Sequence, residues 1–289
     1  MLLSENERFS IHHGDCIPHM FEVMPENSVD FSVFSPPFPS LYAYTDSESD
    51  LGNVATMGSE SKLHFSYFFK ALSRVLKPGR VAIVHCCQIP RMKRAGEDRG
   101  MHDFRGLLIR LGERAGLTYE YDWCIRKNPQ SQALRTRSRE LQFAGLEKDR
   151  SRTRGAIADY LIKFTAPGEN EVPIDAKGDV SRNNWIDWAE PAWMDIRETD
   201  TFNTDEGKGE EDTRHICPLQ KEVIARCVKL YSNPDEIVLS PFSGIGSELR
   251  VALKLGRRAY GCELKDEWYE LAKKRCSQIE VGSKEKALF

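Results

Sequence analysis

The stretch EIVLSPFSGIGSELRVALKLGRRAYGCE, residues 236–263, has the pattern of an apolar strand, a glycine-rich turn, a helix and a second apolar strand. This order predicts a parallel sheet covered by helices. Gly244 and Gly246 allow the turn to approach a ligand closely, and Glu263 follows Gly244 by nineteen residues, where an acid can bind both hydroxyls of a ribose. A Gly-x-Gly pair alone is as often a purely structural turn. A third glycine and basic phosphate ligands are missing, which favours a nucleoside cofactor such as S-adenosylmethionine over a dinucleotide.

Apolar strands and amphipathic helices alternate through most of the chain. Strands are expected at residues 30–34, 81–84, 119–125, 159–164, 236–239 and 259–262. Helices are expected at 62–76, 102–115 and 219–230, from the glycine-rich turn to Leu255, and from 266 onward. This pattern predicts an α/β fold with a Rossmann-like, mostly parallel sheet. Residues 166–213 lack sustained periodicity and are expected to be irregular. The chain is therefore divided into residues 1–165 and 214–289, two halves of one sheet, with the irregular region 166–213 between them.

The strand expected at 30–34 runs directly into Ser35-Pro36-Pro37-Phe38. The exocyclic amine of a nucleobase is a poor nucleophile because its lone pair is delocalised into the ring. The Ser35 hydroxyl and the Pro36 carbonyl can accept hydrogen bonds from both N–H groups, and the prolines hold the backbone in place. Phe38 offers a ring against which an extruded base can stack. A double proline that merely ends a strand is the alternative interpretation of this tetrapeptide.

The segment Ser240–Ser247 resembles the D-P-F-x-G-S-G-T cofactor motif of the bacterial and phage DNA amino-methyltransferases, which act on adenine N6 or cytosine N4. In their permuted β group the catalytic motif precedes the cofactor motif, as it does here. Further matching segments are residues 12–16, 25–30, 76–79 and 214–219, and 166–213 matches only as loosely as a target-recognition region would. The resemblance implies a circularly permuted fold of the S-adenosylmethionine methyltransferase type.

The resemblance also implies roles for individual residues. The catalytic positions are Ser35, Pro36, Pro37 and Phe38. The expected cofactor contacts are Glu263 at the ribose, Asp15 and Cys16 at the adenine, His215 near the methionine end, and Ser240, Phe242, Ser243, Gly244 and Gly246 in the turn. Taken alone, Asp15 is equally well explained as a turn residue and His215 as a loop hydrogen-bonding group. Ser240 stands where the family has an aspartate that helps to hold the cofactor's ammonium group.

The resemblance leaves the target amine open. Ser-Pro-Pro-Phe is typical of cytosine N4 enzymes, but Phe34 replaces their usual threonine, and adenine N6 enzymes are the commoner members of the family. Cytosine C5 is disfavoured because Cys86 and Cys87 lack the Pro-Cys context of that nucleophile. An RNA or protein amide methyltransferase is a second hypothesis, although such enzymes place the glycine turn first. An inactive DNA-binding specificity subunit is a third hypothesis.

Charge is distributed unevenly along a chain whose net charge is −3. Residues 126–154 contain nine basic and three acidic side chains, whereas 195–212 contain eight acidic and two basic ones. A solvated surface is the commoner explanation of such a run. Between two expected strands, however, the basic segment can form a loop beside the catalytic motif and bind phosphates. The predicted contacts to double-stranded DNA are Arg126, Lys127, Arg135, Arg137 and Arg139.

Composition narrows the setting of the protein. The eight cysteines show no C-x-x-C pair, so we expect a reducing cytoplasm and no metal site. The N-terminus turns polar too soon for a signal peptide, and no apolar run has the length of a membrane helix. The resemblance implies a homodimer, as is frequent in the β group. The sequence identifies no restriction endonuclease partner.

Overall fold

A computed structural model describes residues 2–39, 44–54, 58–91, 100–136, 143–175, 178–202 and 218–279. Its centre is a single sheet with the strand order β1-β10-β9-β2-β3-β7-β6-β8. The strands are β1 (Phe9–His13), β2 (Val29–Phe34), β3 (Leu76–Cys87), β6 (Thr118–Ile125), β7 (Asp159–Thr165), β8 (Ala192–Trp193), β9 (Ile237–Ser240) and β10 (Arg258–Glu263). Only β7 is antiparallel to its neighbours among these pairs. The predicted α/β, mostly parallel sheet is confirmed.

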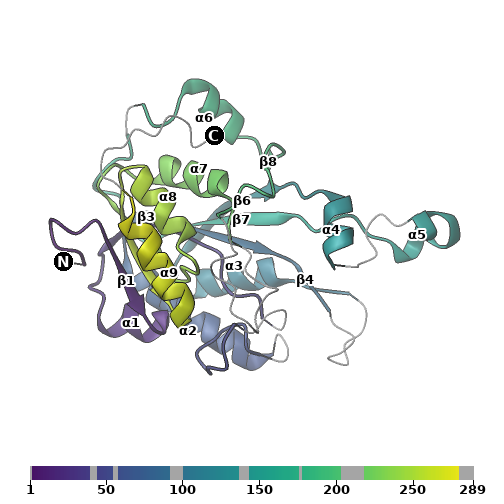
Figure 1. The fold of residues 1–289 in the computed structure, drawn as a ribbon, viewed down its shortest axis with the longest axis horizontal. Coiled ribbons are helices and arrows are strands. Elements are labelled where there is room, and N and C mark those ends of the chain that lie inside the picture. The colour runs from purple at the N-terminus through teal and green to yellow at the C-terminus, as the bar shows by residue number, and fades with distance from the viewer. Residues whose placement is uncertain are drawn as a thin grey trace.

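Helices cover both faces of the sheet, as Figure 1 shows. One face carries α1 (Cys16–Glu22), α2 (Ser59–Val75) and α3 (Phe104–Arg114). The other carries α7 (Lys221–Tyr231), α8 (Ser247–Lys254) and α9 (Asp266–Ser277). All six residues of the central strand β2 are buried, as expected for a strand covered on both faces. Among the described residues, no helix combines the length and the apolar composition needed to cross a membrane.

Strands β2 and β9 lie side by side although about two hundred residues separate them in the chain. The helix after β9, α8, leads to β10 on one side, and the helix after β2, α2, leads to β3 on the other. Neighbouring parallel strands whose crossovers diverge leave a crevice at their carboxyl ends, where ligands bind in open α/β sheets. Ser35-Pro36-Pro37-Phe38 and the glycine turn both begin at this edge.

Two regions contain more regular structure than the sequence indicated. The segment 126–154, expected to be a loop, contains α4 (Pro129–Thr136), α5 (Phe143–Lys148) and the 3₁₀ turn η2 (Arg150–Arg152). Figure 1 shows this arm extending beyond the end of the sheet. The region 166–213, expected to be irregular, contains α6 (Arg182–Trp188) and β8. These elements span eight residues at most, so they are too short to produce a recognisable apolar period.

Smaller departures concern the edges of elements. The Lys77-Pro78-Gly79 breaker lies within the beginning of β3, because α2 ends at Val75 and β3 begins at Leu76. A two-stranded ribbon of β4 (Ile89–Pro90) and β5 (Met101–His102) was not anticipated. Trp188 and Trp193 in the region 166–213 are buried rather than loosely arranged. The backbone carbonyl of Trp188 accepts hydrogen bonds from the indoles of Trp123 and Trp193.

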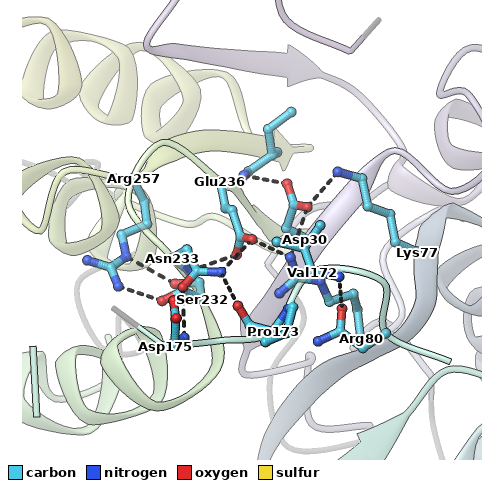
Figure 2. A network of polar contacts seen from close by, with 12 residues as sticks. Asp30, Lys77, Arg80, Val172, Pro173, Asp175, Ser232, Asn233, Glu236 and Arg257 are labelled. Atoms are coloured by element: carbon cyan, nitrogen blue, oxygen red, sulfur yellow. Dashed lines mark hydrogen bonds and ion pairs between the residues drawn. The ribbon is translucent and has the colours of Figure 1, made fainter. Parts of the chain in front are cut away.

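A buried ionic network ties β2 to its neighbours at the end of the sheet opposite the crevice, as Figure 2 shows. Asp30 accepts a hydrogen bond from the backbone N–H of Ile237 at 2.9 Å and one from Lys77 at 2.5 Å. Its carboxylate also faces Arg80, which is 2% exposed and paired with Glu236 as well. Asn233 donates to Glu236 and to the carbonyl of Pro173, which attaches the region 166–213 to this network. Asp30 therefore fixes β2 next to both β9 and β3.

Replacing Asp30 with alanine is expected to lower the free energy of unfolding by about 3 kcal/mol, because the buried N–H of Ile237 loses its acceptor and the buried Arg80 keeps only Glu236 as a charge partner. The measurement is urea unfolding followed by circular dichroism. Glu26→Ala is the matched control, since Glu26 is 68% exposed in its ion pair with Arg74 and should cost no more than about 1 kcal/mol. Equal costs for the two variants would contradict the role given to Asp30.

Candidate active site

A cavity of about 840 Å³ lies at the carboxyl ends of β2 and β9. Ser35, Pro36, Pro37 and Phe38 line one part of it, and the glycine turn lines another; the cavity-lining turn residues are Pro241, Phe242, Ser243, Gly244 and Ile245. The two motifs identified in the sequence therefore share one cavity. Its volume lies in the range of sites that enclose a small-molecule ligand.

The glycine turn has a backbone that requires glycine. Gly244 and Gly246 have φ values of 50° and 83°, a left-handed conformation that other residues adopt at a cost. A Cβ on Gly246 would also lie 3.0 Å from the Ala272 side chain of α9. The backbone N–H of Ser243 donates to the carbonyl of Cys262, and that of Gly246 donates to the carbonyl of Ser243. These bonds fix the turn between β9 and α8.

Glu263 at the end of β10 lies directly beside this turn. Its two carboxylate oxygens accept backbone hydrogen bonds from Gly244 at 2.7 Å and from Lys265 at 2.9 Å. Burial raises the pKa of Glu263 to about 7, against the lowering effect of these N–H groups. The carboxylate thus holds the turn in place and lines the cavity, where it can also accept hydrogen bonds from a ribose.

A second acid, Glu248, was not identified from the sequence. It lies in the first turn of α8, is buried and lines the cavity. Burial raises the pKa of Glu248 to about 8, and the neighbouring Glu263 contributes in the same direction. A buried acid of this kind is suited to a cationic ligand group, whose charge would favour the ionised form. In the sequence, Glu248 could have been recognised as a site residue from its position two residues after Gly246.

Ser240, by contrast, is completely buried at the end of β9, and its hydroxyl has no partner among the described residues. The cavity wall begins at the next residue, Pro241. The position at which the resembling family has an aspartate therefore carries no charge here, and Glu248 is the buried acid nearby along the chain.

Asp15 and Cys16 reach the cavity from β1, which pairs with β10 at the edge of the sheet. The Asp15 side chain caps α1 by accepting from the backbone N–H of Ile17 at 2.8 Å, so it has the structural role of a turn residue and also lines the cavity. Cys16 is buried, and this burial raises the pKa of its thiol. A bond from the Gly14 N–H to the Glu263 carbonyl holds this segment beside Glu263.

The catalytic motif has a polar connection that the sequence did not reveal. Ser35 Oγ lies 3.0 Å from His85 Nδ1, and His85 Nε2 lies 3.0 Å from Asp159 Oδ2. Lys127 Nζ lies 2.6 Å from the same Asp159 oxygen. All four side chains line the cavity. The available signal was a histidine near the end of an otherwise apolar strand, residues 81–87.

The aromatic residues of both motifs are anchored in the core. Phe38 is half-buried, and its ring contacts Phe104 edge-on at 5.7 Å between centroids. Phe242 packs against Phe34 and Phe68, with centroids 5.8 and 4.9 Å away. Both rings line the cavity as well, so their positions are set by packing before any ligand binds.

The predicted DNA-contact residues fall in different places. Arg126 is exposed directly after β6, whereas the Lys127 side chain is only 13% exposed because it is paired with Asp159 in the cavity. Arg135 belongs to the last turn of α4. Arg137, Arg139 and the predicted cofactor contact His215 lie outside the described residues. Within the part of the chain that is described, no three His, Cys, Asp or Glu side chains form a metal-binding group.

Comparison with known proteins identifies relatives of this arrangement. The family model of the N6/N4 DNA methylases matches residues 29–274. The type II methyltransferase M1.MboII of Moraxella bovis is 37% identical over 68 residues, and M.BglII of Bacillus subtilis is 40% identical over 63. These matches cover 24% and 22% of this chain but only 26% and 18% of the two relatives.

Two solved structures share the fold over nearly the whole chain. The protein TTHA0409 of Thermus thermophilus, in a complex with S-adenosyl-L-methionine, superposes with a TM-score of 0.68 at 19% identity, covering 95% of both chains. The cytosine-N4-specific PvuII DNA methyltransferase gives 0.67 at 19% identity and covers 96% of this chain and 88% of its own. The fold is therefore that of the S-adenosylmethionine-dependent methyltransferases.

Replacing Glu248 with glutamine is expected to change how stability depends on pH. The pKa of this carboxyl rises from about 4.5 to about 8 on folding, so between these values the unfolded chain has released a proton that the folded chain retains. The wild type therefore loses up to about 1.4 kcal/mol of stability per pH unit through this group as pH rises. Glu248→Gln has no such carboxyl to lose stability through. Its free energy of unfolding relative to that of the wild type should therefore increase as pH rises from about 4.5 to about 8.

Urea unfolding of the ligand-free protein at a series of pH values measures this difference. Glu22→Gln, at an exposed position at the end of α1, is the matched control. A difference between Glu248→Gln and the wild type that stays constant with pH would show that Glu248 is not buried as described.

Proposed function

Because this chain belongs to the N6/N4 DNA methylase family, we propose that it transfers a methyl group from S-adenosylmethionine to the exocyclic amine of a base in double-stranded DNA. The observation that carries this proposal is the shared cavity, which is lined both by the Ser35–Phe38 motif and by the Pro241–Ile245 part of the glycine turn. Only a site that holds cofactor and amine together can align them for direct transfer.

The wall around the glycine turn fits a cationic nucleoside cofactor. Glu263 would accept the ribose hydroxyls, with Asp15 and Cys16 at the adenine. Glu248 would face the ammonium group and so replace the acid that Ser240 does not supply. The bound cofactor supplies an electrophilic methyl group on a positively charged sulfur. The left-handed glycines and the buried acid both support this assignment.

The Ser35–Phe38 motif would hold the base. The Ser35 hydroxyl and the Pro36 carbonyl accept hydrogen bonds from the two amine hydrogens, which localises the lone pair of the nitrogen on the side facing the methyl group. Phe38 presents a ring whose orientation is already fixed by Phe104, so the base can stack on it without ordering a mobile side chain. Cytosine and adenine both carry an amine that meets these requirements.

The duplex would bind across the mouth of the cavity. A base inside a helix cannot reach Ser35, so it must be flipped out, at a cost of about a few kcal/mol. Arg126 and the arm formed by α4, α5 and η2 lie at the end of the sheet where β6 finishes. Their basic side chains support phosphate contacts that hold the duplex during flipping. The predicted homodimer can be tested by light scattering. Action on DNA is consistent with the cytoplasmic location expected from the sequence.

The direct test is transfer of a labelled methyl group from S-adenosylmethionine to DNA, RNA and protein substrates. Duplex DNA should be labelled, and digestion followed by mass spectrometry should identify either N4-methylcytosine or N6-methyladenine. Label found only in RNA or protein would overturn the proposal. An unlabelled duplex despite tight cofactor binding would instead favour a specificity subunit without activity.

Replacing Ser35 with alanine should lower the single-turnover rate of methyl transfer about 100-fold or more, because one amine hydrogen loses its acceptor. Cofactor affinity, measured by calorimetry, should change little. Ser28→Ala is the matched control, since Ser28 precedes β2 at the opposite end of that strand. Full activity in Ser35→Ala would remove this hydroxyl from the reaction.

Charge reversal of Arg126 and Arg150 together should weaken DNA binding. It should also reduce the salt dependence of binding, by about 0.9 in the log–log slope for each phosphate that is no longer neutralised. Both residues are exposed. The matched control reverses Lys70 and Arg114, which are exposed on α2 and α3. Fluorescence anisotropy with a labelled duplex gives both quantities, and equal losses in the two double variants would argue against a DNA contact at this arm.

A further inference from the structure

The position of the hydrogen on the neutral His85 ring follows from its neighbours. Although burial alone raises the pKa of Asp159, His85 and Lys127 hold the pKa of this carboxyl below its usual value. An ionised carboxylate only accepts hydrogen bonds, so the His85 Nε2 that lies 3.0 Å away must carry a hydrogen. In the neutral ring Nδ1 is then an acceptor, and the Ser35 hydroxyl 3.0 Å from it must be the donor.

This arrangement determines where the lone pairs of Ser35 are directed. Because the Ser35 hydroxyl donates its hydrogen to His85, Ser35 Oγ can only accept hydrogen bonds from a ligand in the cavity. An amine hydrogen of a bound base needs such an acceptor. If His85 were protonated on both nitrogens, Nδ1 would donate to Ser35 and turn the hydroxyl hydrogen toward the base, where it would oppose the amine.

We propose that His85 is a positioning residue that aims the Ser35 hydroxyl at the amine and takes up, through that hydroxyl, the proton that the amine releases. The proposal rests on the proposed function of this site. Asp159 and Lys127 complete the chain: Asp159 fixes the ring orientation of His85, and Lys127 keeps Asp159 ionised. Lys127 thereby has a role inside the cavity, distinct from its predicted contact with DNA.

The step balances in atoms and charge. One N–C bond forms at the amine and one S–C bond breaks, with the electron pair of the broken bond left on sulfur. The methylated amine then holds one surplus proton. This proton passes to Ser35 Oγ while the serine hydrogen passes to His85 Nδ1. Ser35 ends unchanged, and His85 ends as an imidazolium beside the Asp159 carboxylate.

The groups that face this chain come from every strand around it. Asp159 lies on β7 and Lys127 follows β6, while Ser35 follows β2. Cys87 lies two residues beyond His85 on β3 and pairs with Asp159 across the sheet, and Cys124 on β6 lies near Asp159 as well. Asp159 is hydrogen-bonded to His85 and ion-paired with Lys127, so it is the carboxylate that faces the ring. A second hydrogen on His85, at Nδ1, would therefore remove the acceptor of the Ser35 hydroxyl.

Single-turnover methylation of duplex DNA, followed from acid to alkaline pH, tests this role. The wild-type rate should fall at acid pH, where a proton on Nδ1 would remove the acceptor of the Ser35 hydroxyl. His85→Ala should be slower by about 100-fold and lack this acid limb. His85→Asn should recover part of the rate, because its amide oxygen can accept a hydrogen bond from the Ser35 hydroxyl. Its rate should nevertheless not fall at acid pH, because an amide takes up no proton there. His64→Asn on α2 is the control.

A rate and pH profile in His85→Ala equal to those of the wild type would overturn the proposal. Inactivity of the wild type itself would instead indicate failure of the proposed function, so the two failures are distinguishable. Unfolding and cofactor binding are measured on each variant, and a variant that does not fold is replaced by Asp159→Asn, which should also reduce the rate by releasing the His85 ring.

A second readout requires neither cofactor nor activity. In ¹⁵N NMR of the ligand-free protein, the His85 ring should show an unprotonated Nδ1 and a protonated Nε2. Ser35→Ala should leave Nε2 protonated, whereas Asp159→Asn should change the balance between the two tautomers. A wild-type ring protonated on Nδ1 alone would contradict the proposed orientation of Ser35.

Discussion

The pairing of β2 with β9 is the constraint on which the rest of the molecule depends. Phe31 and Ser32 pair with Val238 and Leu239, and the buried Ser32 hydroxyl donates to the Leu239 carbonyl at 2.9 Å. The Asp30 carboxylate also accepts a hydrogen bond from the backbone N–H of Ile237, the first residue of β9. Because side chains alternate along a strand, a shift of one residue would turn the apolar residues of β2 to the wrong faces. The register therefore fixes the position at which the two motifs leave the sheet.

The cavity formed at this edge has two electrostatic environments. Around the glycine turn, Glu248 and Glu263 are buried acids whose pKa values are raised, so this part of the wall favours a positively charged ligand. Around Ser35, an ion pair supports an imidazole that can hold a proton. A methyl transfer begins with a cation and releases a proton, and the two environments correspond to these two demands. The basic residues of the arm after β6 carry positive charge, which is complementary to the phosphates of a DNA backbone.

Local patterns in the sequence predicted most strands of the sheet, the helices α2, α3, α7, α8 and α9, and both motifs, because strand and helix periods and proline or glycine at turns act over a few residues. The edge strand β1 and the helix α1 were not predicted. The short elements α4, α5 and α6 were not predicted because they are too short to show an apolar period. Tertiary contacts, such as those of Trp188 in α6, hold them in place. The cluster of Ser35, His85, Asp159 and Lys127 escaped for a different reason. Its members lie on four segments, and Asp159 reaches His85 only because β7 runs antiparallel to β3, a direction that no local pattern specified. Glu248 escaped because its burial depends on the packing of α8.

The most direct test of the central claim is a crystal structure of the protein with S-adenosylmethionine and a methylated duplex. The account predicts the cofactor against Gly244 and Glu263, with its sulfur directed toward Ser35, and an extruded base between Ser35 and Phe38. A cofactor bound elsewhere, or a base that enters the protein away from the Ser35–Phe38 motif, would contradict the account.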